Sequence, residues 1–113
     1  MNEITTHVLD LSGGVPAAGI DVSLERADTA GHYTAVGRAT TDADGRIASF
    51  GPETVGGAGR YRLTFRVGEY FAVKGAECFF PEVQVLFVAT GASRRLHVPL
   101  LVSPFGYSTY RGS

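Results

Sequence analysis

Cysteine is almost absent from the sequence, because Cys78 is the only one among 113 residues. A single cysteine excludes an intrachain disulfide. It also leaves no Cys/His cluster of the kind that holds a structural zinc ion, so no metal site is expected. The apolar setting AECFF favours a small, buried packing role for Cys78 over a reactive thiol.

The sequence also lacks an excess of either charge. It has 10 basic and 11 acidic residues, and its net charge is -1. A nucleic-acid-binding protein would present a basic face, and the longest basic run here is Arg94-Arg95, which suggests a solvated edge. No apolar run reaches the ~18 residues of a membrane span. The start MNEITTHVLDL lacks a basic segment followed by an apolar one, so we expect no secretion signal and a cytoplasmic protein without nucleic-acid or membrane partners.

Short β-like runs separated by glycine-rich turns fill the chain, which has 15 glycines and a length typical of one domain spanning residues 1–113. Turns are expected at 12–19 and at Asp44-Gly45, and a loop at 51–59. Residues 68–76 could form a short helix whose Tyr70, Phe71 and Val73 pack onto a sheet. Strands are expected at residues 4–11, 20–25, 32–40, 47–50, 60–67, 83–89, 96–102 and 105–110. This spacing is typical of an all-β sandwich.

The run at residues 83–89 is apolar on both faces, with Val83, Val85 and Phe87 on one and Leu86 and Val88 on the other. A strand of a monomeric sandwich usually turns one face to water. We therefore expect the second face to be covered by another subunit or by the helix.

Two histidines are predicted to point away from the core. In residues 4–11, Ile4, Thr6 and Val8 share one face, and Thr5, His7 and Leu9 share the other. In residues 96–102 the apolar positions alternate with His97, Pro99 and Leu101. Either histidine alone could be a solvated surface residue. Together with the outward Leu9 and Leu101, they indicate a covered and partly dry site.

The chain end PFGYSTYRGS keeps Phe105, Tyr107 and Tyr110, although chain ends are commonly polar and frayed. The aromatic residues indicate a docked end. Arg111 brings five donors to it, and Ser113 brings a hydroxyl and a terminal carboxylate. The simpler alternative is an aromatic strand that finishes the sheet.

Two segments carry a family resemblance. HVLDLSGGVPAAGIDV (7–22) and LHVPLLVSPFGYS (96–108) resemble the N-terminal and C-terminal signatures of the transthyretin family, and FFPEVQV (79–85) is also similar. Leu96 departs from the aromatic residue that is usual before the histidine. The ending YRGS resembles the mark of the family's 5-hydroxyisourate hydrolase branch. The resemblance implies a transthyretin-type sandwich of two four-stranded sheets with one short helix, assembled as a homotetramer (a dimer of dimers) around a central channel.

The resemblance also implies an activity: water opens the six-membered ring of 5-hydroxyisourate at its amide bond and gives 2-oxo-4-hydroxy-4-carboxy-5-ureidoimidazoline, without a metal or organic cofactor. Histidine can act as base or acid near neutral pH. Arginine can hold an oxygen-rich ring or stabilise an oxyanion. The expected catalytic residues are His7, Arg46, His97 and Ser113. The expected substrate-binding residues are His7, Arg46, Tyr110, Arg111 and Gly112. His32 matches no residue of this set.

Two alternatives stay open at this point. A transthyretin-like carrier would hold a planar aromatic ligand in the channel, and a purely structural sandwich would bind nothing. His7, Arg46 and His97 together with the terminal tetrapeptide favour the enzyme, because an apolar channel does not need them. Which histidine is the general base is left undecided.

Overall fold

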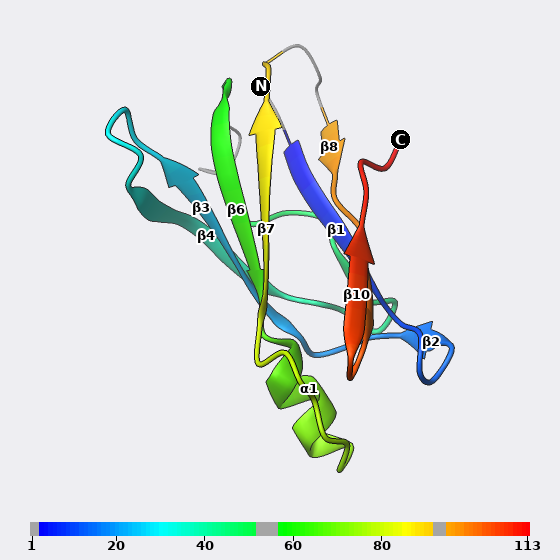
Figure 1. Cartoon of the computed structure of the whole chain (residues 1–113). Coiled ribbons are helices and arrows are strands. Elements are labelled where there is room, and N and C mark those ends of the chain that lie inside the picture. Colours follow the sequence, from blue (N-terminus) through cyan, green and yellow to red (C-terminus); the bar gives the residue numbers. More distant parts are fainter. Residues whose placement is uncertain (1–2, 52–56, 92–94) are drawn as a thin grey trace.

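The computed structural model describes residues 3–51, 57–91 and 95–113, so that part of the predicted loop 51–59 and Arg94 lie outside the described residues. The described chain forms two β-sheets that enclose one hydrophobic core, with a single short helix at one end of the sandwich (Figure 1). The predicted all-β, transthyretin-type class is confirmed.

The first sheet is built around β1 (Glu3–Asp10). Its other members are β2 (Val15–Pro16), β5 (Arg46–Ile47), β8 (Arg95–His97), β9 (Leu100–Ser103) and β10 (Gly106–Thr109). β1 runs parallel to β8 and β9 and antiparallel to β2 and β5, while β10 pairs antiparallel with β9. β1 therefore brings β5, β8 and the end of the chain together, although they are far apart in the sequence.

The second sheet has the order β4 (Tyr33–Thr40), β3 (Asp21–Ala27), β6 (Gly59–Phe65) and β7 (Val83–Ala89), all antiparallel. The inner faces of the two sheets supply the core, in which alternate residues of each strand are buried, as period-two patterning requires. Val8, Leu24, Leu63 and Leu100 are fully buried there.

The described residues form six strands in one sheet and four in the other, instead of the predicted two sets of four. β2 and β5 have only two residues each, and the predicted strand 96–102 is divided into β8 and β9. The division falls at Pro99, which has no N–H for a sheet hydrogen bond. Pro99 lies in this break outside both strands and is buried, so its predicted outward orientation stays a prediction.

The helix α1 (Val67–Val73) confirms the predicted helix with an earlier start. Phe71 is buried and Tyr70 is half-buried, but Val73 is 90 % exposed. Val73 follows Phe71 by two positions, about 200° around a helix, so it faces away from the sheet. The predicted packing of Val73 is therefore wrong. Cys78 is half-buried against the core and not fully buried.

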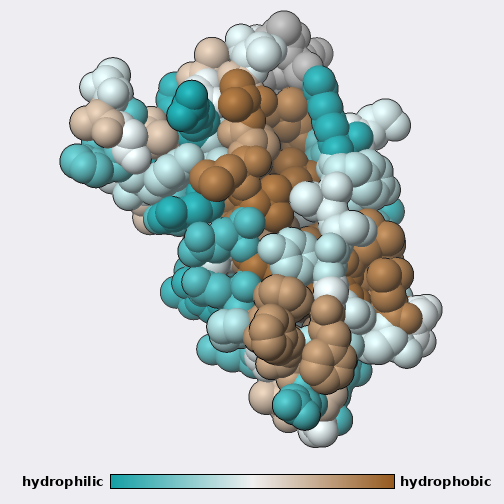
Figure 2. All heavy atoms as spheres, in the orientation of Figure 1, coloured by the Kyte–Doolittle hydropathy of each residue, from teal (hydrophilic) through white to brown (hydrophobic). Residues whose placement is uncertain are grey.

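The outer face of β7 carries exposed apolar side chains. Leu86 and Val88 are 63 % and 65 % exposed, so neither α1 nor another described part of the chain covers them. Figure 2 shows hydrophobic residues gathered over β7 on this side of the molecule. Within the described residues, none of the helices is long and apolar enough to cross a membrane.

Candidate active site

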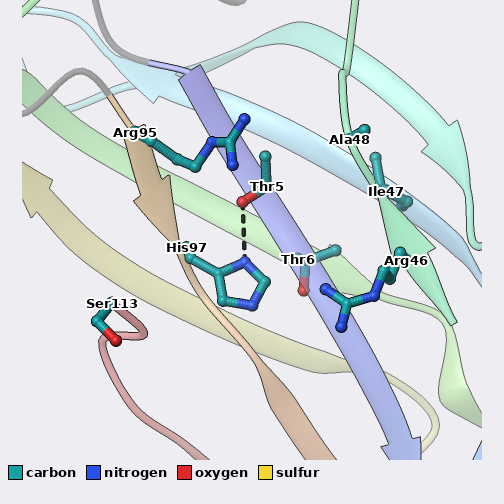
Figure 3. Close-up of a pocket in the computed structure, with 8 residues that line it drawn as sticks. All are labelled: Thr5, Thr6, Arg46, Ile47, Ala48, Arg95, His97 and Ser113. Atoms are coloured by element: carbon teal, nitrogen blue, oxygen red, sulfur yellow. Dashed lines mark hydrogen bonds between the residues drawn. The ribbon is translucent and has the colours of Figure 1, made fainter.

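A polar hollow of about 220 Å³ opens on the outward side of the first sheet (Figure 3). Its lining comes from four places that the sheet brings together, namely β1, β5 with the residue after it, β8 and the last residue of the chain. The residues are Thr5, Thr6, Arg46, Ile47, Ala48, Arg95, His97 and Ser113. Three of the predicted site residues, Arg46, His97 and Ser113, therefore meet in one pocket.

His97 lines this pocket, and its imidazole lies among the other labelled residues in Figure 3. It ends β8 and is the Cα partner of Thr5 on β1. Its Nδ1 is hydrogen-bonded to the Thr5 hydroxyl at 2.8 Å, and the other ring nitrogen points away from Thr5 (Figure 3). The predicted outward orientation is confirmed: Leu96 and Val98 are buried in the core, while His97 is half-buried on the opposite face.

Burial lowers the pKa of His97 below its ordinary value of 6.5, because the surroundings solvate the imidazolium poorly. The charges of Arg46, His7 and Arg95 lower the pKa further. His97 is therefore neutral over a wider pH range than an isolated histidine. A neutral imidazole has a lone pair that can accept a proton, which is what a general base requires.

Arg46 reaches the pocket from a tight turn. The Asp42 carboxylate accepts hydrogen bonds from the main-chain N–H groups of Asp44 (2.9 Å) and Arg46 (3.0 Å). Gly45 takes a positive φ of 74° in this turn, and its carbonyl accepts a bond from Val8 N on β1 at 2.7 Å. The sequence DADGR thus fixes the backbone that carries the guanidinium.

His7 stands beside Arg46 as its Cα partner across β1 and β5. Its Nε2 lies 2.9 Å from the main-chain oxygen of Asp44. A carbonyl only accepts, so Nε2 carries the proton and donates it. His7 shares the face of β1 that holds Thr5, but it is not among the residues that line the hollow around His97.

The end of the chain reaches the site along its backbone. Gly112 N donates to His97 O at 2.8 Å and forms an isolated bridge with that residue. Tyr110 and Arg111 line a second, more apolar cavity of about 300 Å³, whose other walls include Leu86, Val88 and His97. His97 thus lies between the two cavities. The predicted docking of the end is confirmed for the backbone, whereas the side chains of Phe105, Tyr107 and Tyr110 are exposed.

Sequence reasoning missed Thr5 and Arg95 as pocket residues. Thr5 occupies the same strand face as His7 two positions earlier, so the alternation already contained the signal. It is only 8 % exposed, although it lines the pocket. Arg95 is mostly exposed, and its guanidinium lies 3.6 Å from the Glu3 carboxylate, which agrees with the solvated edge expected for Arg94-Arg95. It also lines the pocket.

The third histidine lies outside the site. His32 precedes β4 in the second sheet, is largely exposed, and faces the Asp28 carboxylate at 3.8 Å. Among the described residues, no three histidine, cysteine or acidic side chains gather so as to hold a metal ion.

These observations define a transthyretin-type β-sandwich that carries a polar site on an outward sheet face. The HIUase/Transthyretin family model matches residues 4–112. The 5-hydroxyisourate hydrolase of Salmonella dublin is 44 % identical over 112 residues, which are 99 % of this chain and 82 % of that protein. The chain belongs to the HIUase/Transthyretin family.

Solved structures agree with this assignment. The 5-hydroxyisourate hydrolase of Klebsiella pneumoniae matches with a TM-score of 0.87 at 42 % identity, and the match covers 100 % of both chains. Sea bream transthyretin in complex with thyroxine has a TM-score of 0.91 at 29 % identity and covers 97 % of this chain and 94 % of its own. The backbone is thus shared across the family, whereas sequence identity is higher to the hydrolase.

Proposed function

We propose that the chain is an enzyme of urate degradation that hydrolyses 5-hydroxyisourate to 2-oxo-4-hydroxy-4-carboxy-5-ureidoimidazoline. One observation carries this proposal: a histidine of lowered pKa, His97, shares a pocket with the guanidinium of Arg46 and the hydroxyl of Ser113. Opening a cyclic amide requires an activated water, a donor for the developing oxyanion and a proton for the leaving nitrogen. These three groups can supply all of them.

His97 is the residue that we assign as general base. The neutral ring takes a proton from water at the nitrogen that faces away from Thr5, and the resulting hydroxide attacks the ring carbonyl. As the C–N bond breaks, the same proton passes to the leaving nitrogen, so the reaction adds one water across the amide. The former carbonyl carbon becomes a carboxylic acid, which releases its proton to solvent at neutral pH and leaves a carboxylate. No metal or organic cofactor takes part in this scheme.

Arg46 stabilises the oxyanion and binds the ring oxygens, because a guanidinium presents paired donors in one plane. His7 binds substrate beside it and braces the turn that carries Arg46, through the hydrogen bond to Asp44 O. Tyr110, Arg111 and Gly112 form the wall on the side of the chain end, and Ser113 orients substrate or water with its hydroxyl.

The carrier alternative has less support. The described relative in complex with thyroxine is 29 % identical to this chain, against 42 % and 44 % for the two hydrolases. A pocket around His97 that contains two arginines is also costly to desolvate for a purely aromatic ligand. Polar, oxygen-rich substrates satisfy these groups.

The proposal extends to assembly and compartment. We expect a homotetramer, a dimer of dimers, in which a partner covers the apolar outer face of the edge strand β7. Burying such a face removes apolar surface from water and stabilises the association. The cytoplasmic location expected from the first residues stays a prediction, as does a single domain over residues 1–113.

The activity is tested by adding purified protein to freshly made 5-hydroxyisourate and following the loss of its ultraviolet absorbance. We expect decay that is faster than the spontaneous reaction and proportional to protein concentration. Decay at the spontaneous rate, together with saturable binding of a planar aromatic ligand, would support the carrier instead.

A further inference from the structure

The His97 imidazole is held on two sides by residues that have no acid–base function of their own. We propose that Thr5 and Gly112 are positioning residues, which fix the ring so that Nδ1 stays occupied and only Nε2 exchanges protons with the site. This inference rests on the proposed function for its kinetic consequence, but its structural part can be tested without substrate.

We call Thr5 and Gly112 together the clamp, and Thr5 forms its first side. Its hydroxyl lies 2.8 Å from Nδ1, and its main-chain carbonyl accepts a bond from Val98 N at 2.9 Å. The neighbouring Thr6 hydroxyl donates to Val98 O at 2.6 Å. Side chain and backbone thus connect β1 to the His97 ring and to the residue that follows it. Because Thr5 is also buried, its hydroxyl has little freedom to leave the ring.

Gly112 forms the second side. Its N–H donates to His97 O at 2.8 Å, which holds the chain end against the ring. A Cβ on Gly112 would lie 2.5 Å from His97 Cδ2 and 3.2 Å from Cγ. Carbon atoms do not approach so closely, so any larger residue here would displace the ring or the chain end. Glycine is therefore required by the packing against His97.

The hydroxyl of Thr5 can donate or accept, so it keeps Nδ1 occupied in either tautomer. We assign the proton to Nδ1, because a general base needs a free lone pair on Nε2. A neutral ring with its proton on Nδ1 donates to Thr5 Oγ1 and leaves a lone pair on Nε2. When Nε2 takes up a proton, the bond from Nδ1 to the hydroxyl persists unchanged, so the ring need not rotate during turnover. An uncharged hydroxyl also adds no negative charge that would favour the imidazolium.

Nitrogen-15 NMR of histidine-labelled protein tests the structural part, with the His97→Asn protein identifying the His97 signals. In the wild type above the pKa of His97, we expect Nδ1 protonated and Nε2 unprotonated. Thr5→Val, which keeps the shape but removes the hydroxyl, should give a mixture of tautomers, and Thr5→Ser should restore the single one. A wild-type ring with its proton on Nε2 would overturn the proposal, even if Thr5→Val failed to fold.

Kinetics with 5-hydroxyisourate test the consequence. Thr5→Val should lower kcat by about tenfold or more with little change in KM, because losing an orienting partner misplaces the base. Gly112→Ala should lower kcat as well, because its Cβ would displace the ring or the chain end. Thr5→Ser should keep most of the activity. Thr64→Val, a buried threonine substitution on β6 in the other sheet, serves as control and should leave kcat unchanged.

The outcomes separate the two proposals. Unchanged tautomer and unchanged kcat in Thr5→Val would overturn the positioning role. A changed tautomer in proteins that do not hydrolyse 5-hydroxyisourate at all would support the clamp and contradict the proposed function.

Discussion

His7 donates a hydrogen bond from Nε2 to the main-chain oxygen of Asp44, at a distance of 2.9 Å. The bond connects the centre of β1 to the turn that precedes Arg46 on β5. Because Nε2 carries the proton that it donates to this carbonyl, a neutral His7 has its lone pair on Nδ1. The two site histidines are therefore oriented by different partners, His7 by a main-chain carbonyl and His97 by the Thr5 hydroxyl.

The turn itself gives the first prediction. Gly45 has a positive φ of 74°, and a Cβ there would overlap the main-chain oxygen of Val8. Gly45→Ala should therefore lower the free energy of unfolding by about 2 kcal/mol or more. It should also displace Arg46 and reduce turnover. The measurements are urea denaturation and the absorbance assay.

Gly14→Ala is the matched control, because Gly14 also has a positive φ (66°) but nothing within 4 Å of its Cβ position. It should show only the backbone strain, about 1 kcal/mol. Equal losses in the two variants would mean that the close approach to Val8 is unimportant.

Arg111 gives the second prediction. It lines the cavity that shares His97 with the polar pocket, so Arg111→Ala should remove a charged donor from the substrate wall. We expect a rate loss on the order of 10²–10³ with little change in melting temperature. Arg111→Lys should not restore the rate, because an ammonium cannot reproduce the planar fork. Full activity in Arg111→Ala would show that the residue marks the family without serving the reaction.

The hydrogen-bonded pair of Asp10 and Tyr70 gives a prediction on pH. Burial alone would raise the pKa of Asp10, but hydrogen bonds from Ser12, Tyr70 and the main chain of Gly13 outweigh it and hold the pKa below the ordinary 3.8. Its contribution to stability is therefore present above about pH 4 and is lost as the pH falls through the lowered pKa. Burial, and then Asp10, raise the pKa of Tyr70 from 10.0 to about 12, so the contribution of the phenol is present below pH 10 and is lost as the pH rises towards 12.

Tyr70→Phe should consequently destabilise the protein by about 1–3 kcal/mol at neutral pH, the usual cost of losing a hydrogen bond to a charged group. The difference from the wild type in urea denaturation should be largest between about pH 4 and 10 and should shrink on either side. Tyr107→Phe is the control and should show no such window. A difference that stayed the same below about pH 4 and above about pH 10 would contradict the coupling of the two residues.

Assembly gives the fourth prediction. Light scattering should report a mass near four times that of the 12.0 kDa chain. Leu86→Asp, on the exposed face of β7, should dissociate the assembly and reduce activity, because a charge would be buried in the interface. Val73→Asp, at a residue that is more exposed than Leu86 (90 % against 63 %) but lies on α1, should leave the tetramer intact. A stable wild-type monomer with full activity would contradict the assembly.

Much of the fold could be predicted because alternation in strands is a local property. The alternation around His7 and His97 placed both on the outward face, and the apolar outer side of residues 83–89 is indeed uncovered by the described chain. Local patterns fail where tertiary packing decides. The inward packing predicted for Val73 is wrong, and the break between β8 and β9 was not predicted, because neither the helix rotation nor the break is visible in composition.

The site was only partly predictable for the same reason. The family signatures pointed to Arg46, His97 and Ser113, which the structure brings into one pocket. Thr5 and Gly112 act through the imidazole, and their contacts depend on the register between β1 and β8 and on the path of the chain end. Such long-range register cannot be read from one strand alone.

The central claim is that hydrolysis of 5-hydroxyisourate occurs at the face that holds His97, and one measurement tests it most directly. The absorbance decay is compared for the wild type, His97→Asn, His7→Asn and His32→Asn, all at equal concentration and with folding checked by circular dichroism. We predict a loss of at least about 100-fold for His97→Asn, the usual scale for an acid–base group. We expect a loss of the same order for His7→Asn, which removes a substrate contact and the bond that supports the turn before Arg46, and wild-type turnover for His32→Asn. A folded His97→Asn protein that turns over substrate at the wild-type rate would contradict the account.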